Sequence, residues 1–64
     1  MSKYIISIYD SNDLKKWSKE YEDDQMGAMM MTEKIMMGFK NNPTGYEMDG
    51  ITIYMEDKLK VEFE

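Results

Sequence analysis

The sequence predicts a small α+β domain of the order β-α-α-β-β-β, with both helices packed on one face of a mostly antiparallel four-stranded sheet. Three observations predict this fold: a β-branched and aromatic run near the N-terminus, a long central stretch without proline, and alternating apolar residues around an Asp-Gly pair. The 64 residues contain no repeat and no linker. We therefore expect one domain over residues 1–64.

The first expected strand is residues 4–9, which the polar residues 10–13 end. Ile6 and Ile8 lie on one face of this strand, and Ile5 lies on the other. A strand that is apolar on both faces is typical of the middle of a sheet. We therefore expect it to have a neighbouring strand on each side.

Two helices are predicted next, near residues 11–22 and 25–40. A single helix over both would be about 43 Å long, roughly twice the length of a six-residue strand. The acidic residues 20–24 also disfavour it, because carboxylates are unfavourable at the carboxyl end of a first helix and favourable at the amino end of a second. One continuous kinked helix remains the alternative.

The helix ends follow from local capping residues. Asp10 or Ser11 is expected to cap the first helix, and Asp23 or Asp24 the second. The segment Asn41-Asn42-Pro43 is expected to end the second helix.

The first helix would carry a narrow apolar stripe of Leu14, Trp17 and Tyr21, for which core packing is the simplest role. An exposed Trp17 would instead be an anchor for a protein partner.

The second helix is apolar on nearly all sides. One side is expected to pack on the sheet through Ala28, Met31, Ile35 and Phe39. The opposite side, called here the methionine face, consists of Met26, Met29, Met30, Glu33, Met36 and Met37. A helix that is apolar on all sides is expected to be buried on all sides.

Three kinds of cover for the methionine face stay open. The first helix could fold back over it, although its three large apolar residues are few for five methionines. A second copy could pair through the same helix, which makes a homodimer. A different protein could dock there, because methionine side chains adapt to varied shapes.

The C-terminal third predicts a meander of three strands. Asp49-Gly50 is a strong hairpin signal and pairs Met48 with Ile51 and Tyr46 with Ile53. For the next turn, a three-residue loop over 56–58 keeps the apolar residues together. That register pairs Met55 with Leu59, Ile53 with Val61, and Ile51 with Phe63. One face of this meander is expected to be apolar and covered by the helices.

The composition excludes several classes of function. The chain has no Cys, no His and no Arg, so we expect no enzyme, no cofactor and no metal site. Residues 22–33 match a calcium-binding loop in part, but Met26 stands where an oxygen ligand is needed. Clustered thioethers can bind cuprous copper, which is a minor alternative.

The net charge of −5 and the absence of Arg argue against direct binding to nucleic acid or to an anionic membrane. No run of residues is long and apolar enough for a membrane span. Residues 1–10 have a short apolar run but no basic segment before it and no small-residue cleavage site, so they do not match a signal peptide, and a cytoplasmic location is expected.

The sequence therefore predicts a small acidic protein-binding module, expected to be a homodimer, that acts by occupying a partner's surface. An inhibitor of a host protein from a phage or mobile element is one form of such a module. The expected binding residues are the methionine face and Trp17. The alternative is a nucleic-acid mimic that blocks a basic cleft. Its acidic patch would comprise Glu20, Glu22, Asp23, Asp24, Glu56 and Asp57, with Glu62 and Glu64.

Overall fold

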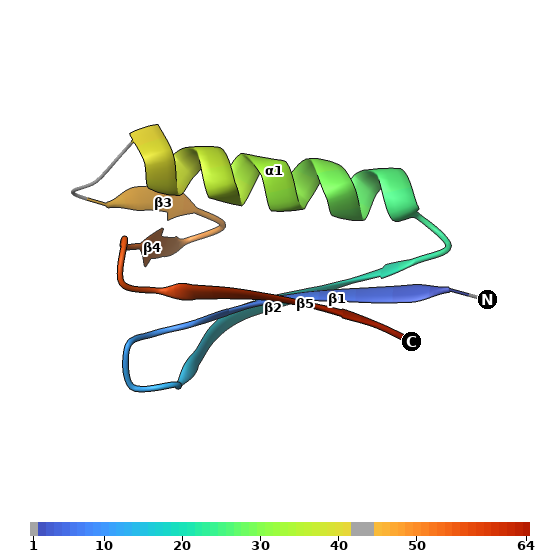
Figure 1. The fold of residues 1–64 in the computed structure, drawn as a ribbon, viewed down its shortest axis with the longest axis horizontal. Coiled ribbons are helices and arrows are strands. Elements are labelled where there is room, and N and C mark those ends of the chain that lie inside the picture. The colour runs from blue at the N-terminus through green and yellow to red at the C-terminus, as the bar shows by residue number, and fades with distance from the viewer. Residues whose placement is uncertain (1, 42–44) are drawn as a thin grey trace.

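A computed structural model describes residues 2–41 and 45–64 of the chain. Its elements are β1 (Lys3–Tyr9), β2 (Lys15–Glu22), α1 (Gln25–Asn41), β3 (Tyr46–Met48), β4 (Ile51–Ile53) and β5 (Lys58–Phe63). The three long strands form one antiparallel sheet in the order β2-β1-β5, and β3 and β4 form a separate two-stranded sheet. In Figure 1, α1 runs along one face of the larger sheet, and the β3–β4 hairpin lies beneath the C-terminal half of the helix.

The first strand and the second predicted helix are confirmed. β1 is the central strand of its sheet, as its two apolar faces predict. The helix begins at Gln25, where the Asp24 carboxylate accepts a hydrogen bond of 2.9 Å from the Gly27 amide. It ends at Asn41, while Asn42 and Pro43 lie outside the described residues.

The first predicted helix is wrong, because residues 15–22 form the strand β2. Asp10 does not cap a helix. Its carboxylate accepts hydrogen bonds from the amides of Asn12 and Leu14, at 2.8 and 2.9 Å, and so closes a turn between β1 and β2. After this turn, β2 folds back along β1. Their pairing extends from Tyr9 opposite Lys15 to Lys3 opposite Glu22. The element order is therefore β-β-α-β-β-β, with one helix.

The predicted Asp49-Gly50 hairpin is confirmed in its register, with Met48 opposite Ile51 and Tyr46 opposite Ile53. Asp49 and Gly50 have φ angles of 48° and 79°, as expected of the tight turn that joins two twisted antiparallel strands. These pairs place Met48 and Ile53 in the core, where they are 5% and 1% exposed.

The second predicted turn of the meander is wrong. β4 ends at Ile53, and β5 pairs with β1 rather than with β4. The Asp57 carboxylate accepts a hydrogen bond from the Tyr54 amide, and the Asp57 amide donates one to the Tyr54 carbonyl. This tight turn redirects the chain toward β1. The predicted four-stranded sheet is therefore replaced by sheets of three and two strands.

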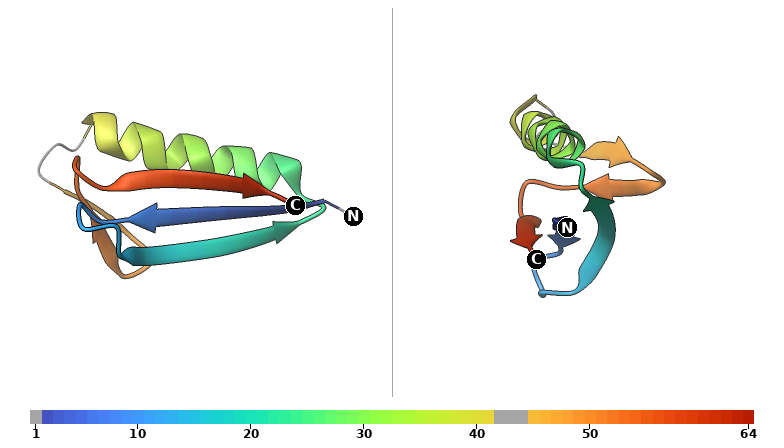
Figure 2. Two further views of the ribbon diagram at one scale, coloured as in Figure 1. Left: turned by 60° about the horizontal axis from the view of Figure 1, so that its bottom comes forward. Right: turned by 90° about the vertical axis from the view of Figure 1, so that its right-hand side faces the viewer.

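The hydrophobic core lies between α1, the larger sheet and the hairpin. Its buried side chains are Ile6, Ile8, Ala28, Ile35, Met48 and Ile53, with partly buried residues such as Tyr4, Trp17 and Tyr21 packed against them. The helix packs over β1 and β2. The end-on view in Figure 2 shows the hairpin beside the helix and the larger sheet below the helix.

Gly38 lets the hairpin approach the helix closely. An ideal Cβ at this buried position would lie 2.6 Å from the Tyr46 ring, so any other residue would force the ring to shift. Tyr46 therefore packs directly on the helix backbone, and this contact fixes the position of the β3–β4 sheet.

Candidate binding surface

The methionine face is open to solvent in the structure. The exposed fractions are 73% for Met26, 57% for Met29, 65% for Met30, 58% for Met36 and 60% for Met37. Glu33 is also exposed. The opposite side of the same helix buries Ala28 and Ile35, so the predicted division of the helix into two faces is confirmed.

The prediction that residues 11–22 of the same chain could cover this face is wrong. Those residues form the turn after β1 and the strand β2, which lies in the sheet on the buried side of α1. Nothing else in the described part of the chain covers the methionines, since all five are more than half exposed. The two remaining predicted covers are another copy and another protein.

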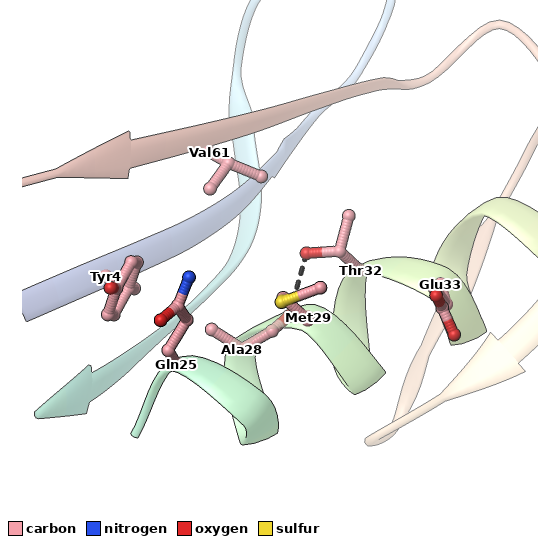
Figure 3. Close-up of a pocket in the computed structure, with 7 residues that line it drawn as sticks. All are labelled: Tyr4, Gln25, Ala28, Met29, Thr32, Glu33 and Val61. Atoms are coloured by element: carbon pink, nitrogen blue, oxygen red, sulfur yellow. Dashed lines mark hydrogen bonds between the residues drawn. The ribbon is translucent and has the colours of Figure 1, made fainter. Parts of the chain in front are cut away.

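An apolar groove runs along the flank of the methionine face, between α1 and β5. Figure 3 shows its lining: Tyr4, Gln25, Ala28, Met29, Thr32, Glu33 and Val61. Its volume is 320 Å³, at the small end for a ligand pocket, and it is open along its length. The hydroxyl of Thr32, one of its polar lining residues, donates its hydrogen bond to the Ala28 carbonyl. The groove therefore fits an apolar side chain of another protein better than a small polar ligand.

Trp17, the other predicted binding residue, does not join this surface. It stands on β2 and packs, partly buried, against the hydrophobic core. Its spacing from Tyr21 is four residues, which places the two aromatic rings on one face of a strand as well as of a helix. Trp17 is therefore a core-packing residue in this structure.

Six of the eight predicted acidic residues lie at one end of the larger sheet, where Glu20 and Glu62 flank Ile5 of β1, and Glu22 and Glu64 flank Lys3. Glu20 and Glu22 lie at the end of β2, followed by Asp23 and the helix cap Asp24. Glu56 and Asp57 precede β5, at the far end. Lys3 also lies 3.3 Å from Glu20 and partly neutralises it.

Asp57 has a structural role. It is 8% exposed and accepts a hydrogen bond of 2.7 Å from the Lys16 ammonium. The same ammonium donates to the Thr52 carbonyl at 2.6 Å and lies 4.9 Å from the centre of the Tyr54 ring. We call Lys16, Asp57, Thr52 and Tyr54 the Lys16 clamp. It joins β2 to β4 and to the turn before β5, so it ties the two sheets together.

Within residues 2–41 and 45–64, no group of three or more carboxylate, imidazole or thiol side chains is placed to hold a metal ion. At the surface of the larger sheet, the hydrogen bond and the negative charge of Glu62 raise the pKa of the Lys60 ammonium.

Sequence reasoning missed a second exposed apolar surface, on β5. Val61 and Phe63 were expected under the helices, but they are 49% and 67% exposed, because α1 lies over β1 and β2 instead. Phe63 contacts only the ring of Tyr4 among aromatic residues in the described chain, at a centroid distance of 5.1 Å. The signal was present as the strict alternation of apolar and charged residues over 58–64.

Comparison with known proteins gives no relative: no family model, no curated protein and no solved structure matches the chain. No helix in the described part of the chain is long and apolar enough to cross a membrane.

Proposed function

We propose that the protein is a non-enzymatic binding module and that its methionine face docks onto another protein. The observation that supports the proposal is the exposure of five methionines on one side of one helix, each more than half accessible. Soluble monomers seldom expose a large continuous apolar patch unless it binds something.

The chemistry of the side chains favours a protein as the ligand. Methionine is unbranched and polarizable, so a row of methionines can adapt to the irregular surface of a folded partner. The apolar helix surface is interrupted by the exposed Glu33, and the chain has a net charge of −5. A partner with an apolar centre and a basic rim would be complementary to both features.

Occupying a partner's surface is the mode of action that we propose, and an inhibitor of a host protein encoded by a phage or mobile element is one form of it. We also propose that the module is dimeric, because small domains without disulfides or metals commonly gain stability by association.

The proposal can be tested by affinity capture with a matched pair of variants. Met30→Glu with Met37→Glu places two charges on the methionine face. Leu14→Glu with Met55→Glu places two charges at positions that are 64% and 62% exposed and lie outside the helix. We expect the wild-type chain and the second variant to retain the same partner, and the first variant to lose it. Equal capture by all three proteins would contradict the proposal.

The nucleic-acid mimic stays a prediction and is separated by its response to salt. A contact made by acidic residues weakens strongly as the ionic strength rises, because exposed charges are screened within about 10 Å at 0.1 M salt. A contact made by the methionine face changes little over the same range. Several of the acidic residues are already engaged within the chain, since Glu20 and Glu62 form ion pairs with Lys3 and Lys60 and Asp57 is buried, and this favours the methionine face.

A further inference from the structure

β5 is an edge strand with an unoccupied side. Lys3 and Glu64 exchange both of their backbone hydrogen bonds, at 3.0 and 2.8 Å, and Glu64 directly follows β5. Because such pairs alternate along an antiparallel ladder, the backbone groups of Leu59, Val61 and Phe63 point away from β1. In the part of the chain that the structure describes, no other strand pairs with this edge.

The side chains of the same residues form an apolar row on the helix side of the sheet. Val61 lies opposite Ile6 and Phe63 opposite Tyr4, yet both are about half exposed or more, at 49% and 67%. Natural proteins usually protect an open edge with charges, bulges or proline. β2, the other edge strand, has a register shift near Tyr9, whereas β5 pairs with β1 without a shift and has an apolar row beside its free edge.

The charged residues of β5 have an order that is complementary to itself. Lys58 and Lys60 occupy the first half of the segment, and Glu62 and Glu64 the second half, all on the face away from the helix. Reversing the strand about Val61 therefore places Lys60 opposite Glu62 and Lys58 opposite Glu64. The same reversal places Leu59 opposite Phe63 and Val61 opposite itself.

We propose that two copies of the chain associate by antiparallel pairing of β5 with β5, with Val61 at the two-fold axis. This register puts Val61 and its counterpart in a hydrogen-bonded pair, which is what their outward-pointing backbone groups require. It also forms opposite-charge pairs on one face and apolar pairs on the other, and each kind of cross-strand pair stabilises a sheet.

Neighbouring registers are unfavourable. With Lys60 at the axis, two lysines would face each other, and with Glu62 at the axis, two glutamates would do so. The Val61 register is the one among these three that has no like-charge pair. The charge pattern therefore selects both the partner, which is a second copy of this chain, and its alignment.

This inference gives the dimer of the proposed function a specific interface, and it does not depend on what docks onto the methionine face. The dimer forms one continuous sheet with both helices on the same face, and it brings the two α1–β5 grooves together at the axis. The dimer contact predicted from the sequence was α1 itself. Pairing through β5 leaves the four methionines that do not line the α1–β5 groove, Met26, Met30, Met36 and Met37, free for a different protein. The two surfaces can therefore be tested separately.

Charge exchange at the paired positions tests the inference. Lys60→Glu and Glu62→Lys each turn the attractive cross-copy pairs into repulsive ones, and we expect self-association to weaken by roughly tenfold or more. The double variant restores opposite charges and should restore the dimer. An equimolar mixture of the two single variants should form heterodimers, because one chain then has glutamate at both positions and the other has lysine at both.

Analytical ultracentrifugation over a range of concentrations measures the association, and thermal melts confirm that each variant is folded. Lys60 and Glu62 also form an exposed ion pair within one chain, at 3.1 Å. That pair is broken in both single variants, so loss of the pair alone would not give heterodimers on mixing.

Two results would overturn the inference: a wild-type chain that stays monomeric at millimolar concentration, or a dimer that neither single variant weakens. Amide hydrogen exchange gives an independent readout. The Val61 amide should become protected as the dimer forms, whereas the Lys60 amide, which faces β1, should be protected at every concentration. Protection of Val61 that does not depend on concentration would contradict the pairing.

Discussion

Breaking the Lys16 clamp should destabilise the fold unequally, depending on which partner is removed. The Asp57 side chain is 2% exposed, whereas the Lys16 side chain is 21% exposed. Lys16→Met therefore leaves a carboxylate buried without its cation, while Asp57→Asn leaves an ammonium that can turn toward water.

The magnitudes follow from these exposures. Removing the cation from a buried carboxylate costs about 3 kcal/mol. Asp57→Asn keeps an oxygen that can accept from the Tyr54 amide and should cost about 1 kcal/mol. The double variant should be more stable than Lys16→Met alone, because it no longer contains a buried uncompensated charge. A domain of this size has a total stability of about 3–10 kcal/mol, so these differences are measurable.

Urea denaturation followed by tryptophan fluorescence gives the four free energies of unfolding for this double-mutant cycle. Trp17 is adjacent to the clamp and partly buried, so its emission should report unfolding directly. Additive losses, or a larger loss for Asp57→Asn than for Lys16→Met, would refute the account of the clamp.

Two further substitutions test the packing, and a third tests the turn between β1 and β2. Gly38→Ala should cost about 1–2 kcal/mol, although alanine favours helices, because the new methyl group meets the Tyr46 ring; a gain in the urea midpoint would contradict this contact. Ile35→Ala should cost about 3 kcal/mol at a fully buried site, and a calorimetric loss below about 1 kcal/mol would argue against the core position. Asp10→Ala should cost about 1 kcal/mol by removing two turn hydrogen bonds, whereas Ser11→Ala, as a control, should be neutral.

The sequence predicted correctly the two elements that depend only on local residues, the β3–β4 hairpin and the helix α1. The Asp49-Gly50 turn sets the hairpin register through the backbone conformation of its own two residues. The helix over Gln25–Asn41 follows from a cap and a periodicity that continues over its full length. Both predictions needed no information from distant parts of the chain.

The strand β2 could not be separated from a helix by its apolar spacing. Trp17 and Tyr21 are four residues apart, and this spacing keeps two side chains on one face in either structure. Leu14 completed an apparent helical stripe, but it is 64% exposed. The polar run of residues 10–13, which closes the β1–β2 turn, was the better signal.

The strand that pairs with β5 could not be predicted from local sequence, because it is set by tertiary contacts. Leu59, Val61 and Phe63 share one face whether the strand pairs with β4 or with β1, so alternation alone cannot choose between them. The choice depends on the Asp57 turn and on the need of β1 for a second neighbour, and both involve contacts over long sequence separations.

The exposed methionine face was predicted from the same helical periodicity as the buried face. Periodicity does not show what covers the methionine face. The helix expected over residues 11–22 could have covered it, but residues 15–22 form the strand β2. The five methionines are therefore the feature on which the proposed function most depends.

The most direct test of that feature is the solvent accessibility of the methionine methyl groups in solution. Methyl NMR with a soluble paramagnetic probe measures it, after each signal is assigned with a single Met→Leu variant. We predict strong broadening for Met26, Met30, Met36 and Met37 at every protein concentration, and for Met29, which lines the α1–β5 groove, at concentrations where the chain is monomeric. Met48, which is 5% exposed, should show little broadening. Protection of those five methyl groups equal to that of Met48 would contradict an open methionine face.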